Sequence, residues 1–126
     1  MILMDNNKII SVVCNRYNES EFKPTCRFKI PVNIENIATK TRMIEFVECR
    51  RISVTLIRYI NGLKTTEFEF LNMTHDLVIH HCKLFFKLVS NEKLYRELIK
   101  KILEDLDIDK STEMEIFKNS KYMLTF

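Results

Sequence analysis

Alternation of apolar with polar side chains predicts β-strands in the first third of the chain. Residues 8–14 form a compact run rich in β-branched side chains, which is typical of a buried strand. Residues 26–30 alternate apolar with basic side chains, as a half-buried strand does. Pro31 ends this second strand, because proline cannot donate a hydrogen bond to a β-ladder.

A β-hairpin over residues 51–71 is the clearest local prediction. Apolar and polar positions alternate on both sides of Asn61-Gly62, a dipeptide that favours tight hairpin turns. A loop of odd length places Leu56 opposite Phe68, whereas a two-residue loop places Leu56 opposite a glutamate. Because a one-residue slip moves every side chain to the other face of a sheet, we expect an odd-length loop or a bulge.

One long helix is predicted over residues 91–106. Leu94, Leu98 and Ile102 recur at helical spacing and form an apolar stripe. Charged residues stand between them and include pairs of opposite sign four positions apart, which stabilise helices. We expect the stripe to be buried against the predicted sheet.

Two segments leave helix and strand both open. Residues 33–47 favour a helix capped by Asn33, and the alternative is a strand over residues 41–49. Residues 76–90 place apolar side chains on one face either as a strand or as a helix. We expect the strand there, because β-branched and aromatic residues are frequent in strands.

The last part of the chain completes an α+β fold. Thr112 and Glu115 have the spacing of a capping box, which predicts a short helix ending near Asn119. Residues 120–126 alternate again and predict a last strand or a docking tail. We expect residues 1–126 to form a single α+β domain. Its mainly antiparallel sheet would carry the long helix on one face, beside one or two shorter helices.

The composition is unusual and excludes several kinds of binding loop. Gly occurs once, Ala once and Pro twice, whereas Ile, Asn and Lys make up nearly a third of the chain. The frequent residues have AT-rich codons, which points to an AT-rich virus, genetic element or microbe as the source. A single glycine excludes the phosphate-binding P-loop and the dinucleotide-binding loop, which need several glycines. We therefore expect no cofactor.

The cysteines and the N-terminal sequence indicate a reducing compartment. The four cysteines lie too far apart for a zinc knuckle; they are Cys14, Cys26, Cys49 and Cys82. The first residues lack the pattern of a secretory signal, so we expect free thiols and a cytoplasmic or nuclear location. The apolar runs are far shorter than the roughly 20 residues that cross a bilayer, which argues against a membrane partner.

A histidine-rich segment carries the residue types of a metal site without its geometry. The segment contains His75, His80, His81 and Cys82. On a strand, His80 and His81 point to opposite faces and cannot share one ion. We therefore expect no metal here, and no catalytic Cys–His pair, because neighbours in sequence rarely meet as nucleophile and base.

A basic cluster predicts a binding surface. The net charge of +3 is uneven, with +5 over residues 1–64 and −2 over residues 65–126. The cluster of interest contains Arg50, Arg51, Arg58 and Tyr59. Arginines beside an aromatic ring suit nucleic acid or an acidic partner. Because the net charge is low for a dedicated nucleic-acid binder, we expect direct binding to be weak.

An acidic run predicts a surface for a basic partner. It contains Glu104, Asp105, Asp107 and Asp109. The aspartates resemble the start of a calcium loop, but Lys110 and Ile116 stand where that loop needs Gly and Glu. Negative charge at the end of a helix opposes the helix dipole, so a basic partner would stabilise the run.

These observations favour a small non-enzymatic subunit or adaptor that docks onto a larger assembly. A transcription or replication complex of an AT-rich virus or genetic element fits the basic half and the composition. A direct single-stranded nucleic-acid-binding protein with an OB-like fold is one alternative. A viral modulator of a host protein is the other. Each of these functions needs a partner and no catalytic site.

Overall fold

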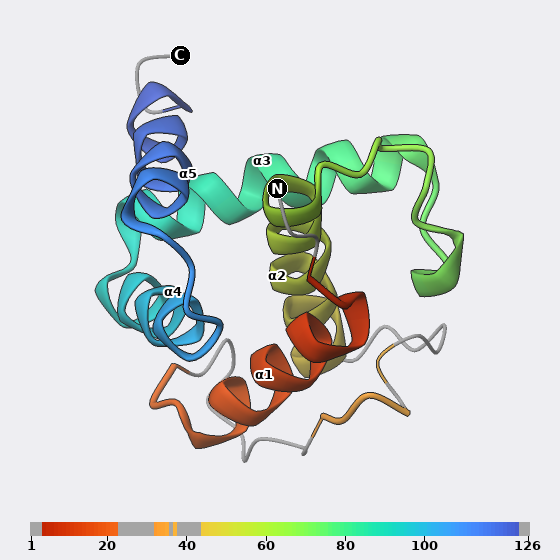
Figure 1. The fold of residues 1–126 in the computed structure, drawn as a ribbon, viewed down its shortest axis with the longest axis horizontal. Helices are drawn as coiled ribbons and strands as arrows, with labels where there is room; N and C mark the ends of the chain where they lie inside the picture. The colour runs from red at the N-terminus through yellow and green to blue at the C-terminus, as the bar shows by residue number, and fades with distance from the viewer. Residues whose placement is uncertain (1–3, 23–31, 36, 38–43, 124–126) are drawn as a thin grey trace.

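The structure is a computed structural model, and its described part is entirely helical. It describes residues 4–22, 32–35, 37 and 44–123, with only the backbone for residues 119–123. These residues form α1 (Asn6–Glu19), α2 (Ile44–Asn61), the short 3₁₀ helix η1 (Glu69–Leu71), α3 (His75–Asn91), α4 (Lys93–Asp105) and α5 (Lys110–Met123) (Figure 1). The described residues contain no strand. The predicted α+β fold with an antiparallel sheet is therefore wrong.

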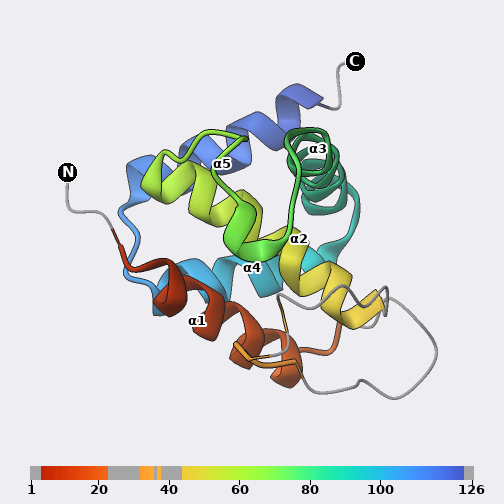
Figure 2. The same cartoon turned by 90° about the vertical axis from the view of Figure 1, so that its right-hand side faces the viewer.

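The helices pack around α2. This helix contacts α1, α3 and α5, and α3 also contacts α4 and α5. Figure 2 shows α2 running between α1 and α5. Helix α4 closes the remaining side of the core by packing against α1 and α3. The residues that the structure describes include no helix with the length and apolar character needed to cross a bilayer.

The burial of α2 explains why a hairpin was wrongly predicted over residues 51–71. All residues from Arg51 to Ile57 are buried, so this part of the helix has no polar face. One of its small polar side chains bonds within the helix, because the Thr55 hydroxyl donates to the backbone oxygen of Arg51 at 2.9 Å. Small polar residues between Val, Leu and Ile produce an alternation that resembles a strand.

The Asn61-Gly62 dipeptide ends a helix instead of turning a hairpin. Gly62 has a φ of 70°, and its N–H donates to the carbonyl of Arg58 at 2.9 Å. A glycine in this left-handed conformation is a common helix terminator. The Asn61 side chain accepts from the Met4 N–H and donates to the Met4 carbonyl at 2.9 and 2.6 Å. The end of α2 is thereby tied to the start of the chain.

Helix α1 replaces the strand predicted over residues 8–14. Asp5 caps it by accepting a hydrogen bond from the Asn7 N–H at 2.9 Å. Its buried face consists of Ile9, Ile10, Val13, Cys14 and Tyr17. This spacing belongs to one side of a helix, so packing against α2 and α4 overrides the β-propensity of the branched residues.

Helix α3 replaces the strand predicted over residues 76–90, and the helical alternative is the correct one. The Thr74 hydroxyl caps it by accepting from the Leu77 N–H at 3.3 Å. The buried side chains are Val78, His81, Cys82, Phe85, Phe86 and Val89. They recur at helical spacing and face α2, α4 and α5.

The predictions for residues 26–49 fall largely outside the described residues. The predicted strand over 26–30 lies wholly outside them. Of the predicted helix over 33–47, residues 44–47 belong to the first turn of α2. Residues 33–35 are described and are not helical. The alternative strand over 41–49 is wrong from residue 44 onward.

The helix predicted over residues 91–106 is confirmed over Lys93–Asp105 as α4, whereas Asn91 is the last residue of α3. Leu98 and Ile102 are 3 % and 0 % exposed, as expected for the apolar stripe. They pack against helices instead of a sheet, because α4 contacts α1 and α3. Leu94 is 42 % exposed, so the expectation that it is buried is wrong.

The short helix predicted after Thr112 is longer and starts earlier. Asp109 caps α5 by accepting from the Thr112 N–H at 2.7 Å, so the cap lies before the predicted capping box. The helix continues through residues 120–123, and the predicted last strand is wrong there. Residues 124–126 lie outside the described part.

Candidate functional site

Arg51 lies inside the fold, although the sequence suggested a surface position. Its residue exposure is 9 %. Its Nη1 donates to Glu48 Oε1, one helical turn earlier on α2, and its Nε donates to His81 Nδ1 on α3 at 3.3 Å. The guanidinium therefore joins α2 to α3, and this arrangement assigns Arg51 a structural role.

The other three residues of the basic cluster, Arg50, Arg58 and Tyr59, also lie on α2. Arg50 and Arg58 are half-buried, and burial lowers the pKa of Arg50. The Arg58 guanidinium lies over the Tyr59 ring, 5.8 Å from its centroid. The same ring meets Phe86 of α3 edge-on, with the two ring centroids 5.3 Å apart. Binding of an anion by the basic cluster, Arg51 included, stays a prediction.

The acidic run spans the end of α4 and its connection to α5. Asp107 has a φ of 53° and its N–H donates to the carbonyl of Glu104 at 3.0 Å. The N–H of Ile108 donates to the carbonyl of Leu103 at 3.1 Å. This pair of hydrogen bonds is the Schellman ending of a helix, and aspartate is among the few residues that tolerate its left-handed position.

The chain itself supplies a basic partner for the acidic run. Arg16 of α1 binds both carboxylate oxygens of Asp105, with Nη2 2.7 Å from Oδ1 and Nε on Oδ2. This paired hydrogen bond lowers the pKa of Asp105. Asp109 caps α5, and the hydrogen bond from Thr112 lowers its pKa. Binding of an external basic partner by the run stays a prediction, with the exposed carboxylates of Glu104 and Asp107 left for it.

The three histidines lie in different environments. His75 bonds the Thr65 hydroxyl, His80 is exposed, and His81 is buried beside Arg51. Burial, together with the charge of Arg51, lowers the pKa of His81 from 6.5 to about 4. Within the described residues, His, Cys, Asp and Glu side chains form no group of three or more suited to a metal ion. Cys82 is a buried free thiol.

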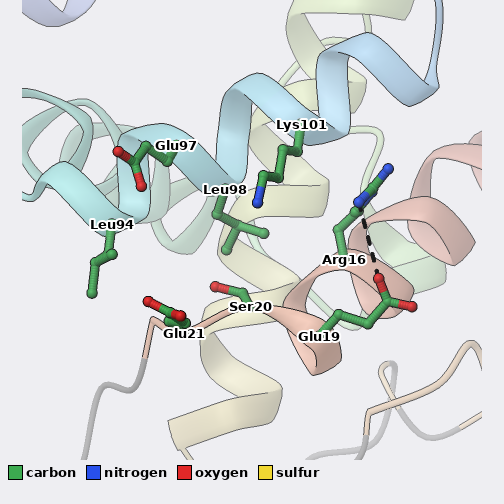
Figure 3. A pocket seen from close by; sticks show the side chains of 8 residues that line it. All are labelled: Arg16, Glu19, Ser20, Glu21, Leu94, Glu97, Leu98 and Lys101. Atoms are coloured by element: carbon green, nitrogen blue, oxygen red, sulfur yellow. Dashed lines mark ion pairs between the residues drawn. The ribbon is translucent and has the colours of Figure 1, made fainter.

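A groove lies between the end of α1 and one face of α4, beside Arg16. Its volume is about 300 Å³, and we call it the α1–α4 groove (Figure 3). Its lining residues are Arg16, Glu19, Ser20, Glu21, Leu94, Glu97, Leu98 and Lys101. The end of α1 forms one side, and one face of α4 forms the other.

The α1–α4 groove combines apolar surface with an excess of carboxylates. Leu94 and Leu98 extend from α4 toward the end of α1 (Figure 3). Three carboxylates also line the groove, those of Glu19, Glu21 and Glu97. The groove also contains two cations, Arg16 and Lys101. Arg16 is paired with Asp105, which partly neutralises its charge. The groove therefore offers an exposed leucine within a mainly negative rim.

Sequence reasoning missed this groove for a simple reason. Leu94 belongs to the apolar stripe of α4, and the stripe alone does not tell which of its leucines lies beyond the core. Across the groove from α4 lie Glu19 to Glu21 at the end of α1, and no spacing in the sequence brings them to Leu94. The available signal was the position of Leu94 in the first turn of its helix, where packing by neighbours is least complete.

Comparisons with known proteins add no relative. The chain matches no family model, no curated protein and no solved structure.

Proposed function

We propose that this chain is a small non-enzymatic docking protein that binds a segment of a partner protein in the α1–α4 groove. The partner segment carries a large apolar side chain next to lysine or arginine. One observation carries the proposal: Leu94, 42 % exposed, lies in a groove lined by three carboxylates. A transcription or replication assembly of an AT-rich virus or genetic element remains the partner that the composition favours.

The apolar part of the groove supports binding energetically. Covering a half-exposed leucine contributes on the order of 1–2 kcal/mol, and well-packed contacts near the centre of an interface carry most of its affinity. Leu98 also lines the groove and is only 3 % exposed, so this part of the wall is held by the fold before a partner binds. Preformed sites bind more tightly because less ordering is needed.

The charged rim supports selection of the partner. The ion pairs that Glu19 and Glu97 make within the chain are long, since Glu19 lies 4.0 Å from Arg16 and Glu97 lies 4.0 Å from Lys93. Exposed pairs of this kind contribute little, so these carboxylates can exchange their partners at little cost. Negative groups around an apolar centre steer and orient a basic segment.

Substitution of Leu94 tests the proposal. We expect Leu94→Asp to reduce the amount of partner protein recovered at least about tenfold, because it replaces the central apolar contact with a charge. The tagged chain is purified from the cells that naturally express it, and the proteins bound to it are quantified by mass spectrometry. Leu77→Asp is the matched control, since Leu77 is 37 % exposed on α3 and lies outside the groove.

Two outcomes would contradict the proposal. Equal partner recovery with Leu94→Asp and with the wild type would exclude the groove. Recovery of nucleic acid as the main bound species would favour the nucleic-acid alternative. That alternative predicts a loss of affinity of roughly a thousandfold between 50 and 200 mM salt for about six phosphate contacts. Circular dichroism of both variants confirms that they remain folded.

A further inference from the structure

A second hollow lies beside the α1–α4 groove, between α2 and α3. Its volume is about 470 Å³, and we call it the α2–α3 pocket. Its lining residues are Phe22, Glu48, Arg51, Leu84, Lys87, Leu88, Asn91 and Glu92. Glu21 lines the groove, whereas the next residue, Phe22, lines the pocket. Leu94 lines the groove, whereas Glu92, two positions earlier, lines the pocket. The two hollows are therefore neighbours on the surface.

The α3 side of this pocket is apolar and basic. Leu84 and Leu88 are half-buried, and both line the pocket together with exposed Lys87. Lys83 is also exposed and lies one turn earlier on the same helix. We call these four residues the α3 face. Residues 77–91 of α3 include no Asp or Glu, so the helix itself supplies no carboxylate to offset the two lysines.

The other charges of the pocket lining stand in pairs of opposite sign. Glu48 accepts a hydrogen bond from Arg51, and both side chains are largely buried. Exposed Glu92 is followed directly by exposed Lys93. The lysines of the α3 face therefore set the charge that an approaching protein meets at this pocket.

The α3 face has the chemistry that the α1–α4 groove selects. The groove presents the exposed side chain of Leu94 within a mainly negative rim. On the α3 face, each leucine follows a lysine directly in the sequence, as Lys83-Leu84 and as Lys87-Leu88. One chain thus carries both an acidic apolar surface and its basic apolar complement. Charge complementarity of this kind orients two proteins and suppresses wrong partners.

We propose that two copies of this chain dimerise, with the α1–α4 groove of each copy on the α3 face of the other. Leu94 of one copy packs against Leu84 and Leu88 of the second, and Lys83 and Lys87 approach the carboxylates of the groove. Because the two surfaces are neighbours, a single two-fold axis brings both contacts together, which is the commonest symmetry of homo-oligomers. The proposal rests on the docking function of the groove and names a second copy as a partner for it.

Sedimentation velocity of the full chain over about 1–200 µM tests the dimer, because association rises with concentration. We expect a monomer–dimer equilibrium with a Kd on the order of 10 µM, at the weak end for interfaces of standard size. Leu94→Asp is expected to weaken dimerisation at least about tenfold, since it removes the apolar centre from both contacts. A wild-type chain that stays monomeric throughout this range overturns the proposal.

Reversal of charge tests which surfaces meet. The groove variant is Glu19→Lys/Glu21→Lys, and the α3 variant is Lys83→Glu/Lys87→Glu. Each variant alone places like charges at both contacts, so we expect each to dimerise at least about tenfold more weakly than the wild type. An equimolar mixture of the two restores opposite charges at both contacts, and we expect it to form mixed dimers. A mixture that stays monomeric, or undiminished dimerisation of either variant, overturns the proposal.

Lys8→Glu/Lys64→Glu is the matched control for the α3 variant. It makes the same change of net charge at two exposed lysines outside both hollows. We expect it to dimerise as the wild type does. If it dimerises as weakly as the α3 variant, net charge and not the α3 face controls association, and the proposal fails. Circular dichroism confirms that all variants remain folded.

The outcome is separable from that of the docking function. A chain that stays monomeric and still recovers another protein in a Leu94-dependent manner retains the docking function and excludes the dimer. A chain that dimerises through Leu94 and recovers no other protein identifies the second copy as the partner of the groove.

Discussion

Arg51→Met is expected to destabilise the fold by about 3–5 kcal/mol, because it leaves the Glu48 carboxylate buried without its counter-charge. The side chains of Arg51 and Glu48 are only 11 % and 6 % exposed. Burial already raises the pKa of Glu48, and the charge and the hydrogen bond of Arg51 oppose that rise. Urea unfolding at neutral pH, followed by circular dichroism, measures the loss.

Two controls identify the buried pair as the cause. The double variant Glu48→Gln/Arg51→Met removes both charges, and we expect it to regain most of the stability that Arg51→Met loses. Arg58→Met removes a half-buried arginine from the same helix and is expected to cost less than about 1 kcal/mol. Equal losses of stability for Arg51→Met and Arg58→Met would show that the buried pair of Arg51 with Glu48 is not the cause.

Acidification from pH 6.5 to pH 4 is expected to destabilise the fold by about 2–3 kcal/mol through His81 alone. The pKa of His81 is lowered to about 4 in the fold, against 6.5 for the ordinary side chain. The unfolded chain therefore binds the proton more tightly than the folded chain. The stabilising effect is complete above pH 6.5 and is lost as the pH falls toward 4. The geometry agrees, because Nδ1 of His81 must be unprotonated to accept from Arg51.

His81→Gln isolates this effect from the other titrating groups. Its side-chain oxygen can still accept from Arg51, and it carries no proton in this pH range. The pKa of Asp105 and of Asp109 is lowered, so their stabilising effect is lost below the ordinary pKa of 3.8. The pKa of Glu48 is raised, and its protonation opposes the effect of His81. If His81→Gln and His80→Gln show the same pH dependence as the wild type, His81 is not the cause.

Helix α4 could be predicted because its residues carry one consistent signal. Leu98 and Ile102 recur at helical spacing, and charged residues fill the opposite face. Helix α2 could not be predicted this way, because neighbours surround it from Arg51 to Ile57 and remove its polar face. A helix that is buried on every side lacks the periodic polar face that marks most helices. Only the conformational propensity of its residues is then left as a signal, and β-branched residues favour a strand.

The ion pairs also differ in whether the sequence could predict them. The pair of Glu48 with Arg51 could have been anticipated, because three positions bring side chains together once the segment is helical. The pair of Arg16 with Asp105 could not, because 89 positions separate its residues and only the packing of α1 on α4 joins them. Local spacing alone therefore cannot tell a charge that binds a partner from one that holds two helices together.

The most direct test of the docking function is photo-crosslinking from within the α1–α4 groove. A photoreactive phenylalanine derivative replaces Leu94 in one version of the chain and Leu77 in another, and both are irradiated in the cells that naturally express the chain. The account predicts one discrete protein adduct from position 94, whose crosslinked peptide contains lysine or arginine next to a large apolar residue, and no such adduct from position 77. An adduct from position 77 alone, or crosslinks mainly to nucleic acid, would contradict it.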